Sequence, residues 1–206
     1  VGSEMSIRDS TEAVVTMEDG TRVELSEIER DLFFTLLVIA GNETTRNGIS
    51  KGMIAFFENP DQWQRWLEHP ELADTMVDEV LRYTSPVNFF RRTATEDTEL
   101  GGQRIKAGDK VLLWYPAGNR DPAEFRDPER FDIGRTPNHH MAFGGGGAHF
   151  CLGANLAKLE IKIIFEELAK RVPDIRLTGE IQRLRMNLVD GIKHFPVEFT
   201  PTPALL

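Results

Sequence analysis

The spacing of apolar residues changes several times along the chain. An apolar stretch follows residue 26 and ends at Phe57, short segments separated by glycine turns occupy residues 87–114, and a second helical pattern covers about residues 151–171. Helices bury a stripe that repeats about every 3.6 residues, whereas strands bury alternate residues. The order of these patterns predicts a mainly α fold with small β-sheets.

One long helix is predicted over residues 26–58. Ser26 and Glu29 have the spacing of a capping box, in which each side chain accepts a hydrogen bond from a free backbone N–H at the helix start. Residues 32–40 are apolar on nearly every side of this helix. We therefore expect its middle to be buried.

Shorter elements surround the long helix. The polar residues 1–25 indicate an exposed lead-in or a short hairpin around Asp19-Gly20. The pattern after the helix predicts helices over residues 60–70 and 72–83, strands within residues 87–114, an ordered loop over residues 119–137, and further strands after residue 172.

Composition restricts the possible partners and compartment. The chain of 206 residues holds 24 Lys and Arg against 33 Asp and Glu, a net charge of −9, which repels nucleic acid and anionic lipid. Its single cysteine excludes an internal disulfide and fits a reducing compartment. The longest apolar run, residues 32–41, is about half of the ~20 residues that a membrane-spanning helix needs. Since the start also lacks a signal-peptide pattern, we expect a cytoplasmic protein without a membrane span and without a nucleic-acid partner.

The one cysteine has a distinctive setting. Cys151 follows a run of four glycines, residues 144–147, and precedes an apolar helix. A lone cysteine is more often a small buried apolar residue. Glycines, however, let the backbone approach a flat cofactor, and a helix N-terminus stabilises a thiolate through its free N–H groups. Such a thiolate is what a heme iron requires to cleave the O–O bond.

A phosphate-binding loop is the alternative interpretation of the glycine run. The run lacks the Gly-Lys-Ser/Thr ending of such a loop and follows no clear parallel strand. The thiolate interpretation is therefore favoured.

The residues around Cys151 resemble the heme-binding loop of the cytochrome P450 family, and the likeness continues through Ala154-Asn155-Leu156-Ala157. The resemblance implies that Cys151 is the axial ligand of the iron of heme b (iron protoporphyrin IX), with His149 at a heme propionate. The loop is one residue longer than the common form, which marks a subgroup of bacterial members. The other residues that the resemblance assigns to the cofactor in this loop are Phe143, Gly144, Gly145, Phe150 and Gly153.

A second motif interrupts the long helix at residues 40–45, Ala-Gly-Asn-Glu-Thr-Thr. Glycine costs a helix ~1 kcal/mol relative to alanine. Taken alone, Glu43 and Thr44 would be a surface acid and a hydroxyl bonded to the preceding turn. The motif resembles the oxygen-activation segment of the same family. This implies that Ala40 and Gly41 line a groove over the heme and that Glu43 and Thr44 relay protons to dioxygen.

An acid and a base lie three residues apart in the second short helix. Glu79 and Arg82 would usually form an exposed pair worth a few tenths of a kcal/mol. Their position resembles the Glu-x-x-Arg helix of the family. The resemblance implies that Arg130 joins them in a buried network that supports the loop before Cys151, with a structural role.

The first strand region carries two neighbouring arginines. Arg92 matches the family arginine that binds a heme propionate, and a guanidinium fork suits a carboxylate. Arg91 is the competing candidate, and a solvated basic edge is the plain alternative. By the same resemblance, Asn88, Phe89 and Phe90 would lie near the substrate.

These motifs follow the family's order, so the chain resembles the C-terminal half of a bacterial P450, with residues 1–206 forming part of a single domain. In that case the apolar face of the long helix is exposed unless a further half covers it. Within the family, residues 40–47, the Phe-Phe-Arg-Arg-Thr strand and the four-glycine loop look like members that act on sterols and methyl-branched lipids.

The resemblance implies a monooxygenase that hydroxylates a lipophilic substrate with O2, either a steroid such as cholesterol or cholestenone or a branched-chain lipid. Electrons would come from a ferredoxin and its ferredoxin reductase, because the chain has no flavin or iron–sulfur motif. Lys158 and Lys162 are candidates for contact with an acidic redox partner, and a solvated face is equally compatible with them. The alternatives are a heme-thiolate peroxygenase or isomerase, and a heme-binding module without catalysis.

Overall fold

The computed structural model describes residues 14–17 and 19–201 of the chain. It divides into two compact units, Val1–Glu43 and Thr44–Leu206, and the boundary falls inside one long helix. We describe each unit by itself.

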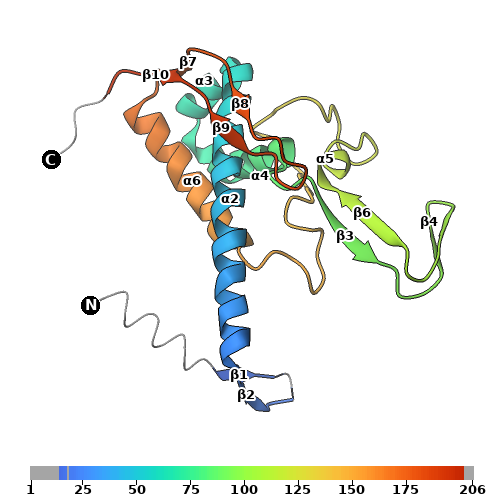
Figure 1. Ribbon diagram of the computed structural model, residues 1–206. Coiled ribbons are helices and arrows are strands. Elements are labelled where there is room, and N and C mark those ends of the chain that lie inside the picture. Colours follow the sequence, from blue (N-terminus) through green and yellow to red (C-terminus); the bar gives the residue numbers. More distant parts are fainter. Residues whose placement is uncertain (1–13, 18, 202–206) are drawn as a thin grey trace, which may run out of the picture. The chain divides into compact units, whose positions relative to one another are not determined.

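The first unit holds a hairpin and the start of that helix (Figure 1). Strands β1 (Val14–Thr16) and β2 (Arg22–Glu24) pair antiparallel around a turn in which Gly20 has a φ of +83°. This confirms the predicted hairpin at Asp19-Gly20 within the described residues. The helix α2 (Glu27–Glu58) then begins with a capping box, because Ser26 N and Oγ both donate to Glu29 Oε2 and Glu29 N donates to Ser26 Oγ.

The apolar stretch at the start of α2 is exposed rather than buried. Leu36, Val38 and Ile39 are 60%, 65% and 67% exposed, and their neighbours from Leu32 onward are also exposed. The expectation of a buried middle was therefore wrong for residues 32–40. A helix is buried only where another element packs on it, and among the described residues the first unit contributes only the hairpin β1–β2 besides this helix.

The second unit has a helical core built from the rest of α2 and four further elements. These are α3 (Pro60–Glu68), the short 3-10 helix η1 (Pro70–Leu72), α4 (Ala73–Thr84) and α6 (Ala154–Arg171). Phe56, Trp66, Met76, Val80 and Phe165 are fully or almost fully buried in it.

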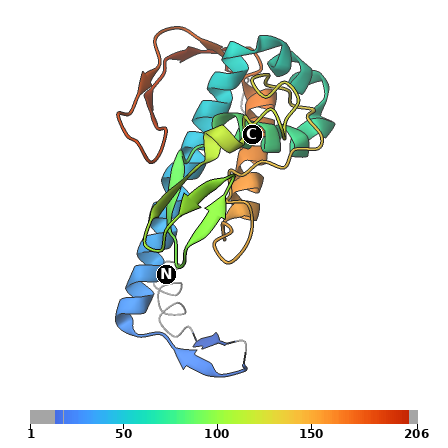
Figure 2. The ribbon, with the colours of Figure 1, turned by 90° about the vertical axis from the view of Figure 1, so that its right-hand side faces the viewer.

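A glycine permits the closest approach in this core. A Cβ atom on Gly52 of α2 would lie 2.7 Å from Val80 of α4 and 2.9 Å from Phe165 of α6. The three helices can therefore meet only where α2 has no side chain. Figures 1 and 2 show α6 running beside the later part of α2.

Small two-stranded antiparallel sheets complete the second unit (Figures 1 and 2). The largest pairs β3 (Phe89–Thr93) with β6 (Lys110–Trp114), so that Phe89 faces Trp114 and Arg92 faces Val111. The others pair β4 (Thr98–Leu100) with β5 (Gln103–Ile105), β7 (Arg176–Leu177) with β10 (Val197–Glu198), and β8 (Gln182–Arg183) with β9 (Ile192–His194).

Most predicted elements are confirmed, with two differences in detail. The helix after the glycine run begins at Ala154 instead of about Cys151, because residues 152–153 form a turn and Gly153 is the N-terminal cap. The short helix α5 (Tyr115–Gly118) was not predicted, since four residues around a proline carry no periodicity.

Candidate functional site

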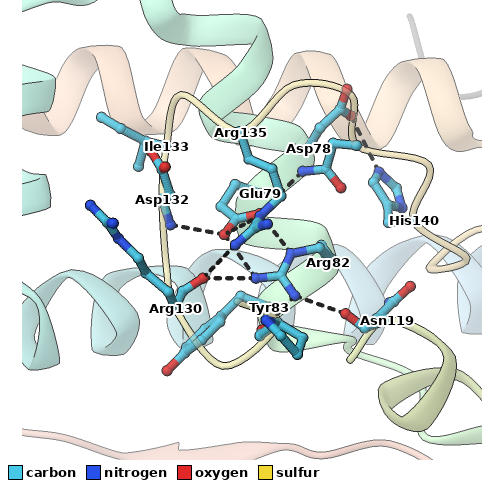
Figure 3. A network of polar contacts seen from close by, with 12 residues as sticks. Asp78, Glu79, Arg82, Tyr83, Asn119, Arg130, Asp132, Ile133, Arg135 and His140 are labelled. Atoms are coloured by element: carbon cyan, nitrogen blue, oxygen red, sulfur yellow. Dashed lines mark hydrogen bonds and ion pairs between the residues drawn. The ribbon is translucent and has the colours of Figure 1, made fainter. Parts of the chain in front are cut away.

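A buried ion network joins α4 to the loop that leads toward Cys151 (Figure 3). The side chains of Glu79 and Arg82 are both 0% exposed. Arg82 donates from Nε to Glu79 Oε2 at 2.7 Å and from Nη2 to Oε1 at 2.9 Å, a two-pronged contact. A buried charge pair of this kind requires that its remaining donors and acceptors also be satisfied.

Loop backbone atoms supply those remaining partners. Arg82 donates to the carbonyl oxygens of Asn119, Pro128 and Arg130 at 2.8–3.0 Å. On the other side, the Asp132 N–H and the Asn138 amide both donate to the Glu79 carboxylate. The network therefore fixes the path of residues 119–138, which have little regular structure of their own.

The third charged member of the network is Arg135, which corrects the prediction of Arg130. Arg135 Nε lies 3.1 Å from Glu79 Oε2, and its other nitrogens donate to loop carbonyl oxygens. Arg130 is an exposed residue that takes part through its carbonyl oxygen, while its side chain points away from Glu79 in Figure 3. The resemblance located the loop, but the side chain that turns back to Glu79 comes from five residues later.

Asn119 carries the network to the cysteine loop. It is fully buried, and its side chain donates to Ser85 Oγ and accepts the Met141 N–H at 2.6 Å. The Met141 carbonyl oxygen in turn accepts the Gly144 N–H. Hydrogen bonds through Met141 and Asn119 thus connect Gly144, at the start of the glycine run, to the Glu79–Arg82 pair.

A second link joins α4 to α6 beneath the same loop. Asp78 accepts from His140 at 3.3 Å and from Lys158 Nζ at 2.6 Å. Burial acts to raise the pKa of Asp78, but the hydrogen bonds from His140 and Lys158 outweigh it, so the pKa lies below its ordinary value. Lys158 also lies over the ring of Phe143.

The four glycines of residues 144–147 all have positive φ angles, between +62° and +106°. Residues with a side chain rarely adopt this backbone, so the loop shape requires glycine at these positions. The loop closes where the Cys151 N–H donates to the Phe143 carbonyl oxygen at 3.1 Å. The run of glycines therefore sets the position of Cys151 relative to Phe143.

Cys151 is exposed and lies three residues before α6. Its carbonyl oxygen accepts the N–H of Ala154, the first residue of that helix. An exposed thiol beside a helix N-terminus and close to a glycine run is available to an external ligand. Among the residues that the structure describes, the positions where Cβ atoms of Gly146 and Gly147 would lie have no neighbour within 4 Å.

Tyr115 lies close both to the strand β3, which carries Arg92, and to the glycine run. Phe90 and Arg92 are two residues apart on β3 and share a face, and the ring of Phe90 lies 6.0 Å from that of Tyr115. Arg92 and Cys151 both act electrostatically on the Tyr115 hydroxyl. Arg91 is exposed and Arg92 is half-buried, and which of the two binds a propionate stays a prediction.

The remaining predicted residues of the loop surround Cys151. Phe143 packs against the buried core, and its ring lies 6.3 Å from the half-exposed ring of Phe150. Gly153 caps α6, with Cys151 Sγ 4.0 Å from where its Cβ would lie. His149 is exposed in the turn before Cys151. Their contacts with a cofactor stay predictions.

The residues of the second motif all belong to α2, which continues without interruption through them. Ala40, Gly41 and Glu43 are exposed residues of the first unit, whereas Thr44 is half-buried and begins the second unit. A Cβ atom on Gly41 would meet open space within the described residues. The proposed groove and proton relay therefore stay predictions.

Tyr115 is the residue of this site that the sequence did not reveal. It is the first residue of α5, and a Cβ atom on Gly144 would lie 3.2 Å from its hydroxyl oxygen. Its position after the apolar strand β6 resembles that of a core aromatic residue, so only the fold brings it to the glycine loop.

Comparison with known proteins defines the class. The model of the cytochrome P450 family matches residues 3–171, and this chain belongs to that family. The family implies a heme cofactor, and the exposed Cys151, the glycine cradle and the neighbouring Arg92 fit one. Among the described residues, no helix is both long and apolar enough to cross a membrane.

Individual relatives narrow the likeness further. The chain is 50% identical over 194 residues to a methyl-branched lipid omega-hydroxylase of Mycobacterium tuberculosis, covering 93% of this chain and 45% of that protein. It is 52% identical over 176 residues to a steroid C26-monooxygenase of Rhodococcus jostii, covering 85% of this chain and 37% of the relative.

Solved structures share the fold. A Mycobacterium marinum cytochrome P450 in complex with pseudoionone has a TM-score of 0.83 at 44% identity, over 90% of this chain and 44% of that one. A Bacillus megaterium protein in complex with testosterone also has a TM-score of 0.83, at 40% identity, over 89% of this chain and 51% of the other. The chain thus spans about half the length or less of these relatives.

Proposed function

We propose that this chain carries the heme-binding region of a monooxygenase that hydroxylates a lipophilic substrate. The observation that carries the proposal is the exposed Cys151 on a loop of four positive-φ glycines beside the N-terminus of α6. That arrangement leaves one sulfur atom available to a large flat ligand while the backbone around it takes no space.

The residues present have distinct tasks toward heme b. The thiolate of Cys151 would be its axial ligand, and Arg92 and His149 would bind its carboxylates. Bound there, the heme would supply the oxidising chemistry that inserts one oxygen atom of O2 into a C–H bond. Phe143, Gly144, Gly145 and Gly153 would shape the surface under the ring.

The helix α2 would supply protons and part of the opposite wall. By the resemblance to the family motif, Ala40 and Gly41 would leave room for dioxygen. Glu43 and Thr44 would pass protons toward it through a carboxylate and a hydroxyl. A peroxygenase would not need this relay, which is the reason to rank that alternative second.

The substrate class follows from the relatives and from the apolar residues of the β3–β6 sheet. The two curated relatives are named for methyl-branched lipid and steroid oxidation. Phe90, Leu112 and Trp114 leave about half of their side chains exposed on that sheet. We infer a long, apolar substrate such as cholesterol, cholestenone or a branched-chain lipid.

The electron donor would be a ferredoxin served by a ferredoxin reductase. Lys158 and Lys162 of α6 were candidates for its docking, and both form ion pairs with acids of α4, Asp78 and Asp74. Exposed pairs of this kind are weak enough to exchange partners. The protein would act in the cytoplasm, with residues 1–206 forming the C-terminal part of one P450 domain.

Turnover tests this proposal. The chain is supplied with heme, cholestenone or a methyl-branched fatty acid, O2, ferredoxin and its reductase, and the products are analysed by mass spectrometry. The proposal predicts a product heavier by one oxygen atom, labelled when the gas is isotopic O2. Turnover with peroxide but not with ferredoxin would favour the peroxygenase alternative, and ligand binding without product would favour a heme-binding module.

A further inference from the structure

Tyr115 is firmly held in place beside the cysteine loop. Its side chain is 5% exposed, and its N–H donates to the Asn88 carbonyl oxygen at 3.0 Å. Its ring packs against Phe90 at 6.0 Å between centroids. Asn88 is itself fixed, because its backbone and side-chain amides donate to the carbonyl oxygens of Leu188 and Asn187. The position of the phenol is therefore set by packing on several sides.

Among the described residues, the Tyr115 hydroxyl has no hydrogen-bond partner, and its oxygen is not fully enclosed although the ring is buried, so the hydroxyl is accessible to a ligand. It faces the glycine run, at 3.2 Å from where a Cβ on Gly144 would lie. Burial raises the pKa of Tyr115, Arg92 opposes this, and Cys151 adds to it. The hydroxyl therefore offers a hydrogen-bond donor beside the glycine run.

We propose that the Tyr115 hydroxyl donates a hydrogen bond to the same heme carboxylate that Arg92 binds, and so positions the cofactor over Cys151. This inference rests on the proposed function, since it needs heme at the loop. A carboxylate is favoured over the sulfur as acceptor, because a sulfur atom is only a weak hydrogen-bond acceptor. A carboxylate oxygen held by Arg92 is also the acceptor that forms the stronger, charge-assisted bond.

The test compares hemin with hemin dimethyl ester, in which both carboxylates are blocked. Dissociation constants of the two compounds are measured by absorbance titration for the wild-type chain and for Tyr115→Phe, which keeps the ring and loses the hydroxyl. Tyr83→Phe is the matched control, because Tyr83 is the one other tyrosine of the chain and packs against Phe131 in the core.

The inference predicts that Tyr115→Phe binds hemin about tenfold more weakly, the loss expected for one charge-assisted hydrogen bond, and binds the ester as well as wild type does. Tyr83→Phe should change neither affinity. Equal weakening toward both compounds would assign Tyr115 a purely structural role and overturn the inference, as would unchanged hemin affinity.

The outcome for the wild-type chain separates this inference from the proposed function. If wild type binds hemin and Tyr115→Phe binds it equally well, the inference alone fails. If wild type binds neither compound, the heme site itself fails and the inference falls with it.

Discussion

The Glu79–Arg82 network and the Cys151 loop are connected through Asn119 and Met141, and they are built in opposite ways. In the network, two side chains are fully buried, and the loop backbone satisfies their remaining donors and acceptors. In the loop, the thiol is exposed, four glycines have positive φ angles, and the nearby Tyr115 hydroxyl has no partner among the described residues.

The difference shows in which region this chain supplies the partners of its own polar groups. Buried charges cost several kcal/mol unless they are paired, so this chain's own atoms pair both Glu79 and Arg82, although the nearby Asn138 Oδ1 has no hydrogen-bond partner among the described residues. The loop instead holds four glycines in a backbone that residues with a side chain rarely adopt, and beside it lies a hydroxyl without a partner among the described residues, which suits a site that binds a ligand. The hydrogen bond from the Met141 N–H to Asn119 Oδ1 joins the two regions, so the ion network helps to position the cysteine loop.

The largest expected effect comes from removing the acid of the network. Glu79→Ala would leave Arg82 and Arg135 buried without a counter-charge and lower the free energy of unfolding by about 3–5 kcal/mol. Urea denaturation followed by circular dichroism measures this. Glu129→Ala is the matched control, because its carboxylate is 77% exposed and its pair with Arg120 is worth less than about 1 kcal/mol. Equal losses in the two variants would contradict the assignment.

The identity of the third charged member can be tested in the same way. Arg135→Ala removes hydrogen bonds to Glu79 and to loop carbonyl oxygens, and we expect it to cost about 2 kcal/mol. Arg130→Ala removes an exposed side chain and should stay within about 0.5 kcal/mol of wild type. A lower urea midpoint for Arg130→Ala than for Arg135→Ala would contradict this assignment and favour Arg130 as the third member of the network.

Two glycine substitutions should change the stability of the protein in opposite directions. Gly144→Ala introduces a Cβ at a φ of +94° and 3.2 Å from the Tyr115 hydroxyl, so it should destabilise the loop by about 1–2 kcal/mol and weaken hemin binding. Gly41→Ala lies in α2 with open space around it and should stabilise the helix by up to ~1 kcal/mol. Thermal denaturation of both variants measures the two changes in stability, and destabilisation by Gly41→Ala would contradict the exposed position of Gly41 on α2.

The smallest expected effect is a pH dependence of the stability that comes from Asp78, which links α4 to His140 and Lys158. Because the folded-state pKa of Asp78 is lowered from 3.8, its bonds to His140 and Lys158 stabilise the fold fully above that value and lose this contribution as the pH falls through and below it. Wild type should therefore exceed Asp78→Asn in stability by a constant amount above about pH 5, and the gap should shrink in acid. A gap that grows in acid would contradict the lowered pKa.

The sequence predicted elements whose signals are local. The capping box at Ser26, the turn at Gly20 and the long pattern of α2 each depend on neighbouring residues, and all three are confirmed. The cysteine loop was also visible, because a run of four glycines before a cysteine has few other uses.

Contacts between distant segments were not predictable in the same way. Arg130 and Arg135 both follow an irregular loop, and which of them turns toward Glu79 depends on how residues 126–138 fold back. The exposure of residues 32–40 likewise depends on what packs against them, which an apolar pattern does not specify. Tyr115 reaches Gly144 only because β3 and β6 pair as they do.

Absorption spectroscopy of the ferrous–CO complex tests the central claim, that Cys151 is the axial ligand of a heme, most directly. The chain is loaded with heme, reduced under CO, and compared with Cys151→Ser and with His149→Ala, which keeps the thiol. The account predicts a strongly red-shifted Soret band in wild type and His149→Ala that disappears in Cys151→Ser. Heme bound with the same unshifted band in all three proteins would contradict it.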